Sequence, residues 1–283
     1  MSWILLASSS VLFFTTLNLL QRVLATESKD QKAMTIIFNS IAALISLVVF
    51  IIGGAYKTFV LPTEPRAYIL LFVAMLFYGL YERGRFVASK LLEASVLTTI
   101  STLSVLVAFV GAAFLYNEPM TPNKILGGLL IIGALAVVSF SKKVKEASAK
   151  GLLVGALISI VLGIGWMCDK AGATYFNTNT YNLLVWTLPL IIIIFPGIKI
   201  SALKEEMKIA SWKVFVLAAV NVFGYLLQLK AVTMADATRV IPIVQLSTLL
   251  TVFMGVVLLK ERDHMFQKFI AGVMAVGGAI LLI

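Results

Sequence analysis

The sequence predicts an all-α polytopic membrane protein whose ten transmembrane helices form two inverted five-helix repeats around a central cavity. Three observations carry this prediction. First, hydrophobic residues make up 60% of the 283 residues, charged residues only 13%, and the mean hydropathy is +1.02. A soluble domain is about half apolar and a quarter charged. Second, apolar stretches of near-spanning length follow one another along the whole chain. Third, the second half repeats features of the first.

Ten apolar segments are each close to the ~20 residues that a membrane-spanning helix needs. They are Trp3–Val23, Ala33–Gly54, Ala67–Ser89, Ser95–Tyr116, Ile125–Phe140, Gly151–Cys168, Tyr181–Gly197, Trp212–Lys230, Ala237–Leu259 and Phe266–Ile283. Backbone groups in hydrocarbon have to be paired internally, and these runs are continuous rather than alternating, so helices are favoured over barrel strands. The first segment has no positively charged leader, and we expect a retained span rather than a cleaved signal.

The net charge of +10 comes from short connections between the apolar segments. Most of the 23 lysines and arginines fall in the odd-numbered connections, including the run Lys142-Lys143-Val144-Lys145. By the positive-inside rule, these connections face the cytoplasm and both termini face outward. Membrane topology therefore explains the positive net charge, and the sequence contains no nucleic-acid-binding motif. The single cysteine, Cys168, excludes an intrachain disulfide.

Residues 88–118 align without gaps to residues 231–261, so that Leu103-Ser104 meets Leu246-Ser247 and Glu118 meets Glu261. The alignment predicts two repeats, one over residues 1–146 and the other over residues 147–283. Because each has five helices, an odd number, the second repeat enters the membrane from the opposite side. Inverted repeats in secondary transporters place the substrate near the membrane midplane between the halves.

These matching stretches resemble the drug/metabolite transporter superfamily, of the EamA type with ten helices. In the second half the resemblance rests on Ala231–Thr238, Ile241-Pro242, Leu258–Glu261, Phe269–Gly272 and Gly277-Gly278. In the first half it rests on Ala88–Ser95, Tyr116–Pro119, Leu126–Gly128 and Gly133, and Thr99 stands where the family often has the proline kept as Pro242. The resemblance implies transport, and the family's cargo includes amino acids, other metabolites, drugs and nucleotide-linked sugars.

The third and eighth segments carry polar stripes in the same register. Tyr78, Glu82 and Arg85 share one helical face, and the repeat aligns them with Asn221, Tyr225 and Gln228. Intramembrane ionisable groups are costly and usually pair across a cavity, so we expect both stripes to bind substrate. Glu82 is the candidate proton carrier and Arg85 its candidate partner. An aromatic belt with a positive flank is the alternative reading of Tyr78 to Arg85.

A second pair of helices adds Thr102 and its counterpart Gln245 as candidate substrate-binding residues. Pro242 is expected to free a backbone carbonyl close to Gln245, which a cavity tolerates. Trp166, Asp169 and Lys170 lie near the end of the sixth segment, where interfacial anchoring is the favoured interpretation and Asp169 and Lys170 can also neutralise each other. No metal cluster, phosphate loop or nucleophile–base set is found, so catalytic residues, metal ligands and cofactors are not expected.

We therefore expect a non-enzymatic secondary transporter, an exporter of a small polar metabolite such as an amino acid. The alternatives are an exporter of lipophilic or cationic drugs, an uncoupled facilitator and, remotely, a membrane scaffold. The expected partners are a small-molecule substrate, protons and the lipid bilayer, without nucleic acid. The expected state is a monomer or weak homodimer in a prokaryotic plasma membrane.

Overall fold

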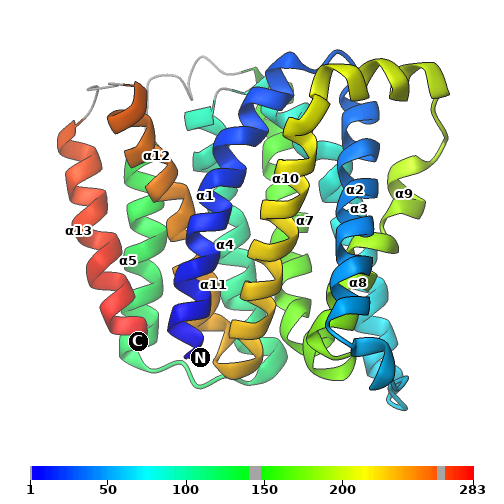
Figure 1. Cartoon of the computed structure of the whole chain (residues 1–283). Coiled ribbons are helices and arrows are strands. Elements are labelled where there is room, and N and C mark those ends of the chain that lie inside the picture. The colour runs from blue at the N-terminus through cyan, green and yellow to red at the C-terminus, as the bar shows by residue number, and fades with distance from the viewer. Residues whose placement is uncertain (1, 93, 140–147, 260–264) are drawn as a thin grey trace.

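The computed structural model describes residues 2–92, 94–139, 148–259 and 265–283, and these ranges contain helices and no strand (Figure 1). The helices are α1 (Trp3–Glu27), α2 (Gln31–Ile52), α3 (Pro65–Leu91), α4 (Ala94–Tyr116), α5 (Pro122–Ser139), α7 (Ala149–Tyr175), α8 (Thr178–Thr187), α9 (Leu190–Ile194), α10 (Ile200–Met234), α11 (Ala237–Val244), α12 (Leu246–Leu259) and α13 (Met265–Leu282), with a 3-10 turn η1 at Ala55–Lys57. The predicted all-α class is confirmed. The lysine run and Glu261 lie outside the described residues, as do the side chains of Arg22 and Thr98.

Each predicted apolar segment coincides with one helix or with two consecutive ones. The seventh segment divides into α8 and α9, and the ninth divides into α11 and α12. α4 continues through Thr99, where the first half lacks the proline of the second. Among the described residues, five helices, α1, α2, α3, α7 and α10, are long and apolar enough to cross a membrane, and five further apolar stretches are shorter. The count of ten spans and their inverted relation stay predictions.

Polar residues at the connections define where several helices begin. The Asp30 side chain accepts from the backbone N–H groups of Lys32 and Ala33 at the start of α2, both over 3.0 Å. Ser148 accepts from Gly151 at the start of α7, and Pro65 is the first residue of α3. These side chains pair amide groups that a helix start leaves without intrahelical partners. Pro65 lacks such an amide and has its φ fixed for a helix.

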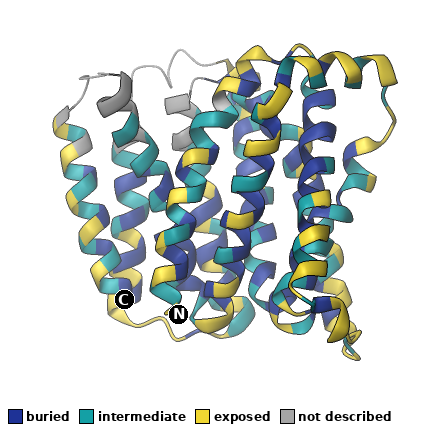
Figure 2. Cartoon of the chain, viewed as in Figure 1, coloured by how far each residue is buried: buried dark blue, intermediate teal, exposed yellow. Residues whose placement is uncertain are grey.

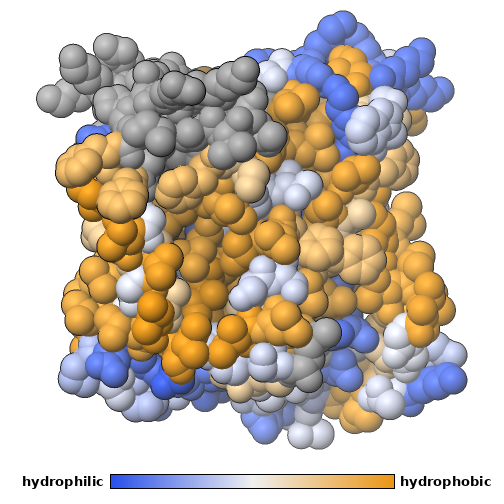
Figure 3. Space-filling model, turned by 60° about the vertical axis from the view of Figure 1, so that its left-hand side comes forward, coloured by the Kyte–Doolittle hydropathy of each residue, from blue (hydrophilic) through white to orange (hydrophobic). Residues whose placement is uncertain are grey.

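Both chain termini lie at one end of the molecule, the terminal end, which also carries the connections after α2, α4, α7 and α10 (Figure 1). Buried residues face the interior and exposed ones face outward or lie at the ends (Figure 2). Many of the exposed side chains are large and apolar, including Leu44, Phe72 and Phe114. The face in Figure 3 carries a hydrophobic band between more hydrophilic ends. Such a band is suited to lipid.

The helix packing has a repeating pattern. α1 lies along α10, and α7 lies along α3; likewise α4 packs on α7, and α11 and α12 pack on α1. α5 and α13 pack on each other, and their backbones touch at Gly127 and Gly278. A Cβ at Gly127 would lie 2.9 Å from the Gly278 carbonyl oxygen, so only glycine permits this approach.

α10 changes direction at Ser211, whose φ of 50° and ψ of −137° are not helical. Its first part, up to Ala210, turns across the end opposite the termini, which we call the opposite end (Figure 1). There the buried Glu206 carboxylate accepts from the backbone N–H groups of Lys29, over 3.1 Å, and Asp30, over 2.8 Å. This contact fastens the second half to the connection between α1 and α2.

Candidate functional site

A cavity of about 150 Å³ lies inside the helix bundle. We call it the central cavity. Its walls come from α1, α2, α3, α4, α7, α8, α10 and the α11–α12 region, so both halves of the chain build it. The lining residues are Phe14, Leu17, Asn18, Gln21, Asn39, Tyr78, Tyr81, Glu82, Arg85, Ser101, Ser104, Leu162, Trp166, Val185, Trp186, Asn221, Tyr225, Gln245, Ser247 and Thr248. Aromatic rings, amides, hydroxyls and one ion pair therefore meet in one space.

Six of the predicted substrate-binding residues line this cavity, namely Tyr78, Glu82, Arg85, Asn221, Tyr225 and Gln245. Thr102 and Gln228 are not among the lining residues. Gln228 is buried on α10, beyond Tyr225 toward the terminal end. Thr102 is half-buried on α4, and its neighbour Ser101 faces the cavity instead. Substrate binding stays a prediction for all eight residues, and the cavity lining favours the six over Thr102 and Gln228.

Glu82 and Arg85 form a buried ion pair, with 2.7 Å between Arg85 Nη1 and Glu82 Oε1. The second carboxylate oxygen of Glu82 accepts from the Asn39 amide over 3.0 Å, and Arg85 Nη2 donates to Gln21. The guanidinium carbon lies 4.8 Å from the centre of the Phe38 ring. Arg85 Nε is buried and has no hydrogen-bond partner among the described residues.

The break between α11 and α12 places Gln245 at the cavity wall. Pro242 lies in α11, and as it has no N–H it removes one backbone hydrogen bond there. The Gln245 N–H still donates to the Ile241 carbonyl over 3.1 Å, and α12 starts at the next residue. Irregular backbone at membrane depth occurs where it is buried in protein or lines a cavity, in keeping with this position.

Asp169 lies behind the cavity wall on α7 and is fully buried. Its carboxylate accepts from three tyrosine hydroxyls: Tyr225 over 2.8 Å, Tyr78 over 2.9 Å and Tyr181 over 3.2 Å. Because Asp169 is near the end of the sixth apolar segment, the sequence favoured a role as an interfacial anchor, with its charge neutralised by Lys170. The structure differs, because Lys170 points away from Asp169 and pairs with Glu118.

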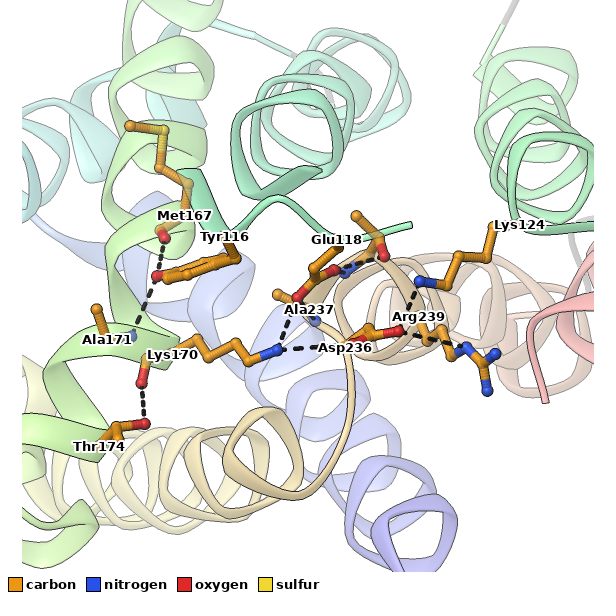
Figure 4. A network of polar contacts seen from close by, with 11 residues as sticks. Tyr116, Glu118, Lys124, Met167, Lys170, Ala171, Thr174, Asp236, Ala237 and Arg239 are labelled. Carbon is orange, nitrogen blue, oxygen red and sulfur yellow. Dashed lines mark hydrogen bonds and ion pairs between the residues drawn. The ribbon is translucent and has the colours of Figure 1, made fainter. Parts of the chain in front are cut away.

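Charged residues close the terminal end of the bundle (Figure 4). Glu118 accepts from the backbone N–H groups of Ala237, over 2.9 Å, and Thr238, over 3.0 Å, at the start of α11. Lys170 Nζ lies 2.7 Å from Glu118 Oε1 and 3.7 Å from Asp236 Oδ1, and Lys124 Nζ lies 2.6 Å from Asp236 Oδ2. We call Glu118, Lys124, Lys170 and Asp236 the terminal network. It connects the two halves of the chain.

The charges of this network shift the pKa of Asp236. Partial burial acts to raise the pKa of the Asp236 carboxyl, but the hydrogen bond and charge of Lys124 outweigh it. Lys170 and Arg239 add to the effect, and the pKa is held below its ordinary value. Asp236 is therefore ionised, and the network holds together, over the physiological pH range.

Toward the opposite end the central cavity is continued by an outer pocket of about 400 Å³. Seven residues line both, namely Asn18, Gln21, Tyr81, Arg85, Ser101, Leu162 and Thr248. The outer pocket extends to Lys90 and Leu92 where α3 ends. The space inside the bundle therefore extends from the central cavity toward the opposite end, whereas the tyrosines around Asp169 and the terminal network lie toward the terminal end.

Comparisons with known proteins agree with this architecture. Residues 149–283 match the EamA-like transporter family, which confirms the resemblance inferred from the sequence motifs. A solved structure described only as "Crystal structure of protein" is similar over 99% of this chain and 95% of its own, with 16% identity and a TM-score of 0.68. At that identity the likeness extends to the fold alone. No curated protein matches in sequence.

Proposed function

Because residues 149–283 match a family of membrane transporters, we propose that this integral membrane protein is a secondary transporter that exports a small polar metabolite such as an amino acid. The observation that carries the proposal is the central cavity, where an ion pair, amides and aromatic rings surround a space that continues into the outer pocket. Ligand sites join apolar walls to a few placed polar groups in this way.

The side chains in the wall of the central cavity favour a zwitterionic substrate. Arg85 Nε is a buried donor without a partner among the described residues, and guanidinium groups bind carboxylates well. Glu82, three residues earlier on α3, offers a carboxylate to an amine. The amides of Asn221 and Gln245 and the aromatic rings would hold the remainder of the molecule. The small volume favours a metabolite over a bulky drug.

Alternating access between two inverted repeats is the proposed mechanism. Its support is the packing pattern, in which the contacts of α1 with α10, α11 and α12 have counterparts in those of α7 with α3 and α4. In such a mechanism one half rocks against the other around a fixed site. Breaking the terminal network and closing the outer pocket would move the access from the opposite end to the terminal end.

Lysines and arginines support an orientation for this cycle. They are concentrated in connections at the opposite end, which by the positive-inside rule faces the cytoplasm. The termini would face outward, and the described arrangement would load from the cytoplasm, as an exporter requires. The proposed location is a prokaryotic plasma membrane.

Thermal stabilisation of the purified protein by a metabolite panel tests the substrate class. A ligand that binds the folded state stabilises it by mass action, so at least one amino acid should raise the melting temperature. The matched variants are Asn221→Ala, which alters the cavity wall, and Gln228→Ala, which alters a buried amide outside it on the same helix. The increment should fall in the first and persist in the second. Equal increments in both variants would place binding elsewhere.

An uncoupled facilitator is a second candidate, favoured by one observation. Glu82, the proton carrier expected from the sequence, is paired with Arg85 and bonded to Asn39. Both oxygens of this carboxylate therefore already accept from donors within the protein. The role of Glu82 in coupling stays a prediction, which Glu82→Gln tests: if Glu82 carries the proton, transport by this variant no longer depends on an imposed pH gradient. Unchanged dependence would remove Glu82 from coupling.

A further inference from the structure

The Asp169 carboxylate occupies a site built from both halves of the chain. Tyr78 reaches it from α3, Tyr181 from α8 and Tyr225 from α10. The Tyr78 hydroxyl lies 2.9 Å from each of the two carboxylate oxygens, and the Tyr225 hydroxyl lies 2.8 Å from Oδ1. We call these three tyrosines the tyrosine cage.

Two glycines on α7 make room for the cage. Gly165 is four residues before Asp169 and Gly172 three residues after it, so all three share one face of the helix. A Cβ at Gly165 would lie 2.9 Å from the Tyr78 ring, and one at Gly172 would lie 2.1 Å from the Tyr181 ring. Aromatic rings are too rigid to yield to such contacts. The spacing of these residues therefore lets two tyrosine rings pack closely on α7 with their hydroxyls at the carboxylate.

No cation neutralises this carboxylate within the described part of the chain. Lys170, the next residue, is bound to Glu118 and Asp236. Of the other titratable neighbours, Cys168 lies beside Asp169 on α7, and Tyr116 of α4 donates to the Met167 carbonyl over 2.5 Å. Both are neutral groups. A buried charge without a counterion is costly, and a bound proton removes the charge.

The cage also connects Asp169 to the central cavity. Tyr78 and Tyr225 both line the cavity, their hydroxyls donate to Asp169, and the two hydroxyls lie 3.4 Å apart. A tyrosine hydroxyl both donates and accepts, so the pair forms a path along which a proton can pass between cavity water and the carboxylate. Glu82, by contrast, is held by Arg85.

We propose that Asp169 with its tyrosine cage is a proton-binding site that couples transport to a pH gradient. One proton from the cavity binds one carboxylate oxygen, and the charge of Asp169 changes from minus one to zero. The protonated oxygen then donates to a cage hydroxyl that formerly donated to it. Since Tyr78 belongs to the first half and Asp169 to the second, protonation alters a contact between the halves that alternating access would move. The proposal rests on the transport function proposed above.

Infrared difference spectroscopy of the purified protein observes this proton without any substrate. As the pH is lowered, the wild type should gain a carbonyl band from a buried protonated carboxyl group. The band should be missing from Asp169→Asn and present in Glu82→Gln. Should Asp169→Asn fold poorly, Tyr181→Phe removes one cage donor outside the cavity lining, and the band should then appear at a higher pH than in the wild type. A band that persists in Asp169→Asn, or is unmoved in Tyr181→Phe, would overturn the proposal.

Transport assays separate this inference from the transport function itself. In proteoliposomes, Asp169→Asn should retain exchange of labelled for unlabelled amino acid but lose accumulation driven by a pH gradient. Accumulation that still follows the gradient would overturn the role of Asp169 and leave the transport function standing. If no amino acid is exchanged even by the wild type, the proposed substrate is wrong, and the infrared result alone decides the proton site.

Discussion

Lys170 of the second half donates to Glu118 of the first half over 2.7 Å, at the terminal end of the bundle. Glu118 is also held by the backbone at the start of α11, so a single carboxylate receives donors from α7 and α11. Both partners are mostly buried, and a buried pair that loses one member leaves an uncompensated charge. In an alternating-access cycle these contacts are the ones that must separate for the terminal end to open.

Glu118→Gln is therefore predicted to favour opening at the terminal end. The amide keeps the shape but loses the negative charge that attracts Lys170. A cysteine introduced at Gln245, in a Cys168→Ala background, should react faster with a membrane-impermeant maleimide added on the side of the termini. Glu205→Gln, at an exposed pair on the opposite end, is the control and should leave this rate unchanged. Equal labelling rates in Glu118→Gln and its parent would show that Glu118 does not keep the terminal end closed.

The stability of the terminal network is predicted to fall in acid. A carboxyl whose pKa is lowered by folding contributes stability that is complete above its unfolded pKa, near 4, and is lost as the pH falls through the lower folded value. Melting temperatures measured from about pH 6 to about pH 3 should therefore decline more steeply for the wild type than for Asp236→Asn. Parallel curves would contradict the role of Lys124 in lowering this pKa.

Arg85→Leu is predicted to destabilise the fold strongly, because Glu82 would remain buried without its cation. Loss of one member of a buried pair costs about 3–5 kcal/mol. Arg83→Leu, two residues away and exposed, should change the unfolding free energy by less than about 0.5 kcal/mol. Unfolding in denaturant measures both. If the two variants are equally stable, the pair contributes little to the fold.

Glu206 and Glu205 allow a matched test at the opposite end. Glu206→Ala leaves two backbone N–H groups, of Lys29 and Asp30, without their acceptor, which costs about 2–4 kcal/mol. Glu205→Ala breaks only an exposed pair with Lys29 and should cost about 0–1 kcal/mol. A similar loss in the two variants would mean that the Glu206 contact does not hold the connection.

The sequence predicted the class of fold and much of the cavity from one physical rule, that polar groups in an apolar span need partners. Tyr78, Glu82 and Arg85 were visible for this reason, and the repeat pointed to Asn221 and Tyr225. The position of a residue along the helix axis, relative to the cavity, was harder to predict. Gln228 is on nearly the same face as Asn221, but seven residues at ~1.5 Å each place it about 10 Å further along α10, past the cavity.

The sequence did not indicate that Asp169 belongs to a buried site, because the next residue in the chain is a lysine. A carboxylate beside an ammonium at a helix end favours local neutralisation, and only the packing of α4 against α7 and α11 shows that Lys170 is drawn to Glu118 instead. The glycines at positions 165 and 172 were the available signal. Thr102 shows a related limit, since one residue along a helix turns the side chain by about 100°, which separates it from the cavity-facing Ser101.

Exchange of radiolabelled amino acids in proteoliposomes, without any ion gradient, tests the transport function most directly. Vesicles loaded with an unlabelled amino acid should take up its label when they contain the wild type. Uptake should be reduced in Asn221→Ala, at the cavity wall, and kept in Gln228→Ala, outside it. If no amino acid in the panel is exchanged above the level of protein-free vesicles, a transporter of amino acids built around this cavity is contradicted.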